Sequence, residues 1–272
     1  MSAITSAVNP YRLLTERLAL ESSRDVLTFD NNPVSVGDHQ PIKLEETGKI
    51  CVVGGGKAAA GFAAGFEPLL GVARLDKPKV HGLVSVPEGC GIQLDHIEVR
   101  ETRTHQHNLP TDAVVRATHE MLEQLSRLKQ EDLAFVLITG GASALLESPR
   151  EHISLQSLVH LTENLSQAGV DIQTLNAIRC MTSKVKAGGL AKSCTAGKLV
   201  VLVLSDVLDD SLAVLGSGPC MPHITEPSII EKVLLNSNIS ECDRAIISGA
   251  ANEYLKEHDA LLHPRTNSGD WI

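Results

Sequence analysis

The residues best suited to chemistry lie in a glycine-rich stretch at 49–64, KICVVGGGKAAAGFAA. Gly54, Gly55 and Gly56 follow a short apolar run and precede Lys57, which opens an alanine-rich segment typical of a helix. A strand, a glycine turn and a helix in this order direct backbone N–H groups and the positive end of a helix dipole toward an anion. The lysine adds a mobile positive charge that suits phosphate. The alternative is a tight turn with a solvated lysine.

This stretch departs from the P-loop pattern, which requires a glycine where Cys51 stands and a serine or threonine where Ala58 stands. It fits the looser G-x-G-x-x-A pattern of dinucleotide-binding proteins, starting at Gly54. That pattern needs an acidic residue at the end of the next strand, and Asp76, which has the spacing, falls in a predicted loop. A nicotinamide-dependent enzyme therefore stays a distant alternative.

A second glycine turn follows the apolar run at 133–139, in the sequence TGGASALLESP. Gly140, Gly141 and Ser143 lie where the turn meets the expected start of a helix, a place that offers backbone donors to phosphate. Leu145 disfavours the G-x-S-x-G turn of hydrolase nucleophiles. The alternative is a close contact between a helix and a strand.

Two further loops carry polar residues. Asp206 follows the most apolar run of the chain, 199–204, and a carboxylate there can hold Mg²⁺ or act as a base, with a helix N-cap as the alternative. Ser217 and Gly218 form a tight turn that could contact a ligand, although the turn alone is weak evidence.

Arg179, Lys184 and Lys186 form a basic group of helical character. Arg179 could hold a carboxylate through a bidentate fork, whereas Lys184 is expected on a solvated face. His105 and His107 have a spacing that can suit a metal on a strand, but no third ligand is near them in the sequence, which disfavours a metal site.

Strands and helices are expected to alternate along the chain. The central strands are apolar throughout, which indicates a mostly parallel sheet covered on both faces. In such α/β sheets ligands bind at the carboxyl ends of the strands, so the three loops after the apolar runs are expected to converge on one crevice. The expected strands are 50–53, 82–86, 97–99, 133–139 and 199–204, and the expected helices are 10–23, 57–70, 111–128, 154–168, 171–179, 183–196, 228–235 and 242–256.

Composition narrows the class of protein. The 272 residues are 43% hydrophobic and 21% charged, which favours a globular chain with an aliphatic core, since aromatic residues make up only 3%. A net charge of −9 and the lack of a basic stripe argue against nucleic-acid binding. No apolar run is long enough to span a membrane. The first 25 residues lack the features of a secretory signal, so we expect a cytoplasmic protein, with the mitochondrion as the main alternative. The six cysteines show no zinc spacing and are expected to be reduced thiols.

An ordered set of motifs resembles glycerate kinases of the type that carries a MOFRL domain (glycerate 2-kinase, class II). The motifs cover about 8–227 and read GGGKAAAGFA, GLVSVPEG, HNLPTDA, LITGGASALLESP, NAIRCMTSKVKAGGLA, LSDVLDD and GSGPCMP. The resemblance implies a Rossmann-like α/β/α domain with three layers, and phosphoryl transfer from ATP to D-glycerate with Mg²⁺. It implies that Lys57 is the catalytic lysine and that the TGGAS turn and the segment starting at Ser205 line the nucleotide and substrate crevice. Arg179 and Lys186 are the expected substrate ligands.

The chain also departs from this family. IRCMTS and KAGGLA stand where members usually read VRKHLS and KGGRLA, so a lysine, a histidine and an arginine are lost. The C-terminal MOFRL domain, which carries a catalytic arginine in the family, is missing. We therefore expect one N-terminal domain over 1–272, with the last ten residues as the tail of an alternative product. An inactive truncated isoform that binds nucleotide or a protein partner is the alternative function, and a homo-oligomer is compatible with the sequence.

Overall fold

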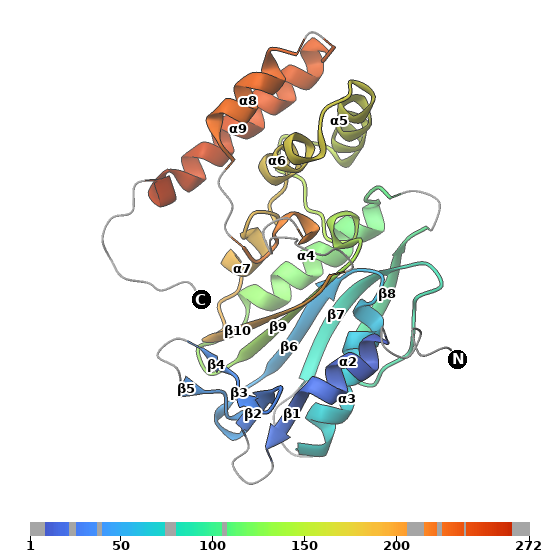
Figure 1. The fold of residues 1–272 in the computed structure, drawn as a ribbon, viewed down its shortest axis with the longest axis vertical. Coiled ribbons are helices and arrows are strands. Elements are labelled where there is room, and N and C mark those ends of the chain that lie inside the picture. Colours follow the sequence, from blue (N-terminus) through green and yellow to red (C-terminus); the bar gives the residue numbers. More distant parts are fainter. Residues whose placement is uncertain are drawn as a thin grey trace.

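The structure is a computed structural model, and it describes residues 9–21, 26–36, 40–73, 80–104, 108–205, 215–221, 225–236 and 238–262 (Figure 1). The helices are α2 (Pro10–Arg17), α3 (Ala59–Ala73), α4 (Asp112–Ser126), α5 (Leu155–Gln167), α6 (Ile172–Thr182), α7 (Gly189–Lys192), α8 (Pro227–Leu234) and α9 (Glu241–Leu262), with 3₁₀ turns η1 (Leu44–Glu46), η2 (Ala142–Ala144) and η3 (Leu215–Ser217). The strands are β1 (Leu18–Glu21), β2 (Val26–Phe29), β3 (Asn32–Pro33), β4 (Ser35–Val36), β5 (Gln40–Pro41), β6 (Ile50–Gly55), β7 (Val80–Pro87), β8 (Ile97–Arg103), β9 (Leu133–Thr139) and β10 (Lys198–Leu204).

The central sheet has five parallel strands in the order β10-β9-β6-β7-β8. Its three innermost strands are apolar along most of their length, because both faces of the sheet are covered. All five strands overlap the strands expected from the sequence, although β8 continues to Arg103, beyond the expected end at Val99. The predicted parallel α/β sheet is therefore confirmed.

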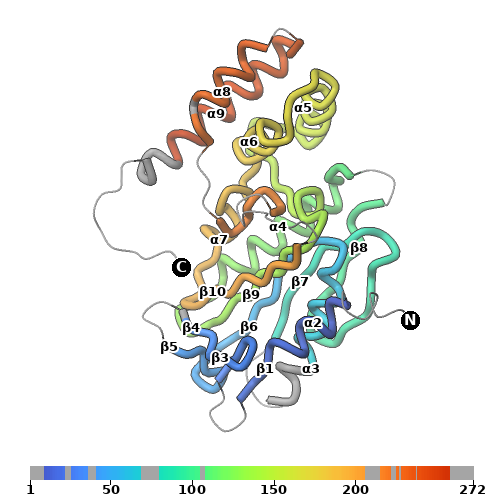
Figure 2. The backbone as a smooth tube through the Cα atoms, viewed as in Figure 1, coloured from blue at the N-terminus to red at the C-terminus, as the bar shows by residue number. Residues whose placement is uncertain are grey.

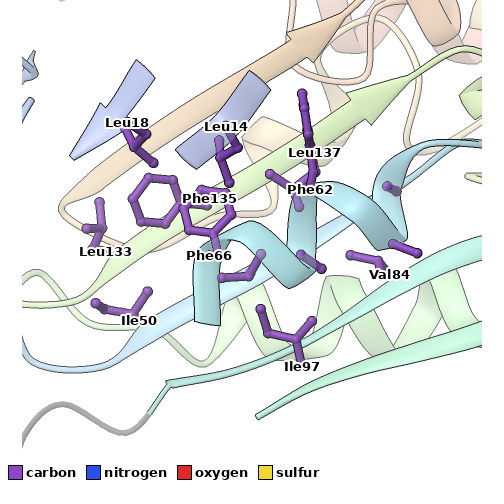
Figure 3. Close-up of a cluster of buried hydrophobic side chains, with 14 of the residues drawn as sticks. Leu14, Leu18, Ile50, Phe62, Phe66, Val84, Ile97, Leu133, Phe135 and Leu137 are labelled. Carbon is purple, nitrogen blue, oxygen red and sulfur yellow. The ribbon is translucent and has the colours of Figure 1, made fainter. Parts of the chain in front are cut away.

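One face of the sheet packs against α2 and α3 (Figure 3). Ile50 and Val52 of β6 point to this face, as alternation along a strand requires. The rings of Phe66 in α3 and Phe135 in β9 lie with their centroids 4.7 Å apart and form the centre of the cluster. The other buried side chains labelled in the close-up are Leu14, Leu18, Phe62, Val84, Ile97, Leu133 and Leu137.

The opposite face packs against α4. Cys51 and Val53 of β6 point to this side and belong to one cluster with Met121 and Leu125 of α4. The N-terminus of α4 is capped as expected, since Thr111 Oγ1 accepts a hydrogen bond from the backbone N–H of Val114 at 3.2 Å. Helices on both faces give the three layers of the predicted fold.

Helices α5, α6, α8 and α9 form a helical group that stands apart from the sheet (Figure 2). They share a hydrophobic cluster of their own, in which Tyr254 and Ile247 of α9 are fully buried. Ser154 and Asp171 cap α5 and α6 at their N-termini, as expected from the sequence. Arg150 connects this group to the loop that follows β9, because its guanidinium pairs with Glu257 of α9 at 2.8 Å.

Three expected elements differ from the structure. The expected helix at 10–23 ends at Arg17, and the chain continues into β1, which pairs antiparallel with β2. The helix expected at 183–196 is reduced to α7, because Ala187 and Gly188 have φ values of 51° and 86°, which no right-handed helix accommodates. The helix expected at 242–256 is extended to Leu262.

In the described part of the chain, none of the helices combines the length and the apolar character that crossing a membrane requires.

Candidate functional site

The two predicted glycine turns lie side by side at the carboxyl edge of the sheet. Strands β6 and β9 are parallel neighbours, with Gly55 beside Ile138 in register. The backbone N–H of Lys57 donates to the carbonyl oxygen of Gly140 at 2.9 Å, and the N–H of Ala58 donates to Thr139 Oγ1 at 3.1 Å. Loops that are more than 80 residues apart in the sequence therefore form one surface, as the strand order requires.

Internal packing explains two of the three glycines before Lys57. A Cβ at Gly54 would lie 2.1 Å from the carbonyl oxygen of Leu137, and a Cβ at Gly56 would lie 2.0 Å from Thr139 Oγ1. These glycines allow β6 and the turn after it to lie against β9, which corresponds to the structural alternative for this motif. Their contact with a ligand stays a prediction.

Lys57 is the exposed cation of this surface. Its side chain extends past the second turn, since a Cβ at Gly141 would lie 3.5 Å from both Cγ and Cε of Lys57. Gly141 has a φ of 86° and precedes η2, whose first backbone N–H groups have no partner within the turn. With no ion pair to another described residue, the ammonium of Lys57 can interact with an anion bound at that turn.

The third predicted turn meets the second. The hydroxyl oxygens of Ser143 and Ser217 lie 3.1 Å apart, and either hydroxyl can donate. Ser217 is buried and has a φ of 64°, and its carbonyl oxygen accepts a hydrogen bond from the N–H of Ala187 at 3.1 Å. Gly218 follows, also at positive φ. Ala187 and Ser217, two non-glycine residues in the left-handed region, are thus linked by this hydrogen bond. Backbone strain of this kind tends to collect at functional sites.

Arg179 lies on α6 at the same side of this surface. It lines a small cavity of about 40 Å³ together with Asn108, Ser143 and Glu147. Burial lowers the pKa of Arg179, and the negative charge of Glu147 partly offsets this effect. Its hydrogen bond to Asn176 Oδ1, 3.3 Å long, engages one N–H group of the guanidinium. The cavity has room for a small polar group and not for a nucleotide.

Lys186 is placed differently from the substrate ligand that the sequence suggested. Its side chain is fully buried, and its ammonium pairs with the carboxylate of Glu147, which is 4% exposed. It also donates to the carbonyl oxygen of Leu146 at 3.3 Å. Both acceptors are protein groups in the interior, so the Lys186 ammonium is engaged within the protein, and its contact with a substrate stays a prediction.

The expected metal ligand, Asp206, lies outside the described residues, as do His105 and His107. Ser205 is described: it is exposed and directly follows β10, where Leu204 is beside Thr139 in register. Within the described ranges there is no group of three or more His, Cys, Asp or Glu side chains that could hold a metal ion. The role of Asp206 as a Mg²⁺ ligand therefore stays a prediction.

Two larger cavities lie away from Lys57. One of about 770 Å³ is an apolar groove between β10, α2 and the β2–β3 hairpin. The other, of about 690 Å³, lies between α7 and α9 and carries charged groups of both signs. We place the candidate site at the glycine turns, because there the backbone N–H groups at the start of η2 lie beside Lys57, which forms no ion pair with another described residue.

Sequence reasoning missed Thr139, Glu147 and Asn108 as parts of this surface. Thr139 ends β9 directly before the second glycine turn, so its position is a signal that could have been used. Glu147 and Lys186 are 39 residues apart and belong to no motif spacing, so their pairing becomes visible only in three dimensions.

Comparisons with known proteins find relatives in sequence and in structure. The chain is 35% identical to the glycerate kinase of Rattus norvegicus over 224 residues, which are 78% of this chain and 40% of that protein. It is 36% identical to the glycerate 2-kinase of Pyrococcus horikoshii over 207 residues, which are 75% of this chain and 44% of that protein. A crystal structure of a Pyrococcus horikoshii OT3 protein superposes with a TM-score of 0.73 and 30% identity, over 91% of this chain and 52% of that one.

The chain thus spans about 40% of the length of the curated relatives that it matches. Residues 1–249 match the model of one protein family. This range includes both glycine turns and the turn at Ser217. The chain therefore belongs to the family described as a domain of unknown function, DUF4147.

Proposed function

We propose that this chain carries the nucleotide-binding part of a glycerate kinase, which transfers a phosphoryl group from ATP to D-glycerate. The observation that carries the proposal is the junction of the two glycine turns, where Lys57 extends past Gly141 without an ion pair to any described residue. Phosphoryl transfer depends on positioning and on neutralising charge, so a free cation above backbone donors suits it. The names of the relatives from Rattus norvegicus and Pyrococcus horikoshii support the choice of glycerate.

The proposal gives each residue a role. Lys57 neutralises the charge of the transferring phosphoryl group, and the turn with Gly140, Gly141 and Ser143 binds phosphate oxygens through its N–H groups. Arg179 binds the carboxylate of D-glycerate. Remaining members of the predicted site, which line its border, are Gly54, Gly55, Gly56, Ser205, Ser217 and Gly218.

A magnesium ion would supply further charge neutralisation between the phosphate groups. In this proposal Asp206 holds the ion through one carboxylate. Ser205, which precedes it in the sequence, follows directly on β10, the strand that pairs with β9. The role of Asp206 rests on its position after β10 in the sequence.

A second candidate function is nucleotide binding without turnover. The match covers 40% of the length of the Rattus norvegicus protein, so the residues that align here need not include every group that its activity requires. In this case the chain would bind ATP, alone or beside a protein partner, through the same two turns.

The experiment is a coupled kinase assay with D-glycerate, ATP and Mg²⁺ on this chain, with ATP binding measured by calorimetry. Lys57→Ala is the test variant and Lys232→Ala the control, because Lys232 is 73% exposed and belongs to α8. Turnover that falls by at least about a hundredfold in Lys57→Ala alone supports the kinase. ATP binding without turnover supports the second function, and neither binding nor turnover in a folded chain contradicts both.

A further inference from the structure

Three charged side chains meet where the loop after η2, the end of α6 and the segment before α7 come together. Glu147 and Lys186 form an ion pair that is almost completely buried, with exposed fractions of 4% and 0%. Arg179 lines the same cavity as Glu147. The three groups carry a net charge of about +1 in their ordinary ionised states, because two cations share one carboxylate.

Both oxygens of the Glu147 carboxylate are engaged by partners other than Arg179. One oxygen pairs with the ammonium of Lys186, and the other accepts a hydrogen bond from the N–H of Ser148 at 3.0 Å. The backbone N–H of Glu147 is held in turn by Thr118 Oγ1 at 3.1 Å. Among the residues that the structure describes, Glu147 and Arg179 form no ion pair within 4.0 Å, although they line one cavity.

We propose that Lys186 is a positioning residue that keeps Glu147 from pairing with Arg179, so that the Arg179 guanidinium stays available to an anionic ligand. A buried carboxylate without a counter-ion is costly, and it takes the nearest cation as its partner. Without Lys186, the cation that lines the same cavity as Glu147 is Arg179, and a bidentate pair would take two of its remaining N–H groups and neutralise its charge. The nature of the ligand, the carboxylate of D-glycerate, rests on the proposed function.

If Lys186 positions Glu147, a second substitution at Glu147 should restore the ligand binding that is lost in Lys186→Met. A purely structural role of Lys186 does not predict this recovery. Lys186→Met removes the ammonium and leaves Glu147 to pair with Arg179, so binding of D-glycerate weakens by about tenfold or more, the usual effect of losing a charge-assisted hydrogen bond. Adding Glu147→Gln removes the competing charge. The double variant is expected to bind D-glycerate within about threefold of the unmodified chain, because a buried pair can be replaced by neutral groups at little cost.

A second readout does not depend on glycerate. Phenylglyoxal modifies guanidinium groups that are not ion-paired. Peptide mass spectrometry measures the rate at which Arg179 is modified. The rate is expected to fall severalfold in Lys186→Met and to recover in the double variant. Lys184→Met is the matched control, since Lys184 is partly exposed and pairs with Glu151 on the surface. Circular dichroism confirms that each variant is folded.

The outcomes separate the two ideas. Suppose that labelling of Arg179 falls in Lys186→Met and recovers in the double variant, but that no form of the chain binds D-glycerate. This result would contradict the proposed function and support the role of Lys186. Labelling that is unchanged in Lys186→Met, or that is lost in the double variant as well, overturns the role of Lys186. If Lys186→Met does not fold, the double variant decides, because the inference requires it to label Arg179 as fast as the unmodified chain.

Discussion

The backbone N–H of Lys57 donates a hydrogen bond to the carbonyl oxygen of Gly140 at 2.9 Å, so the residue that follows the first glycine turn is fixed by the first glycine of the second. The N–H of Ala58 repeats this relationship with Thr139 Oγ1 at 3.1 Å. A change in either turn therefore moves the backbone from which the Lys57 side chain extends. This coupling lets the turns be tested separately for their structural and chemical roles.

Alanine substitutions at Gly56 and Gly141 are expected to have different effects. At Gly56 the new Cβ would meet Thr139 Oγ1 at 2.0 Å and the Thr139 carbonyl oxygen at 2.6 Å, which forces β6 and β9 apart. We expect a loss of about 4 kcal/mol or more in the free energy of unfolding, measured with urea. At Gly141 the nearest atoms are 3.5 Å away, so only the φ of 86° is unfavourable, at a cost of about 1–2 kcal/mol. Equal losses in the two variants would contradict this packing argument.

The sequence contained enough information to predict the sheet and the meeting of its loops. The runs at 50–53, 133–139 and 199–204 are apolar at nearly every position, a pattern that buried parallel strands produce by themselves. Once these strands are parallel, the turns at Gly56 and Gly140 must lie at the same edge. No knowledge of side-chain contacts was required for that inference.

Other features depend on tertiary contacts that no local pattern carries. The segment after Arg17 has the apolar spacing of a helix, yet Leu18 is 1% exposed as part of β1, because pairing with β2 buries it against the sheet. Within the basic group, Arg179 and Lys186 were expected to bind the substrate and Lys184 to lie on a solvated face. Lys184 pairs with Glu151 at the surface, whereas the partner of Lys186 is Glu147 in the interior, a contact that the sequence did not indicate.

Arg150 is expected to hold the helical group to the loop after β9. Its side chain is 4% exposed and contacts Glu253 at 3.1 Å and Glu257 at 2.8 Å, both on α9. Arg150→Met removes the guanidinium that both of these carboxylates contact. We expect a loss of about 2 kcal/mol in the free energy of unfolding, less than for a fully buried pair because the glutamates are 34% and 42% exposed. Arg12→Met is the control, since its pair with Glu16 is exposed, and it should change stability by less than about 0.5 kcal/mol.

Helix α6 carries a pH-dependent cap. Hydrogen bonds from the backbone N–H and the hydroxyl of Thr174 lower the pKa of Asp171 to about 2. A carboxyl whose pKa is lowered by folding stabilises the fold above its unfolded pKa of about 3.9, and loses this contribution as the pH falls toward about 2. Asp171→Ala should therefore be less stable than the unmodified chain at about pH 6, and the difference should shrink between about pH 4 and pH 2. Urea unfolding at several pH values measures it, and a difference that grows on acidification would contradict the cap.

The cysteines should differ sharply in reactivity, because thiolate formation depends on burial. Burial raises the pKa of Cys51 to about 12 and that of Cys180 to about 11, whereas Cys242 lies exposed near the start of α9. The thiolate is the reactive form, so at about pH 8 a disulfide reagent should modify Cys242 first and leave Cys51 and Cys180 unmodified until the chain unfolds. Peptide mass spectrometry after timed labelling gives the order. Early labelling of Cys51 would mean that β6 is accessible, which the three-layer packing around it does not allow, and Cys242→Ser should remove the fast phase without affecting the slow one.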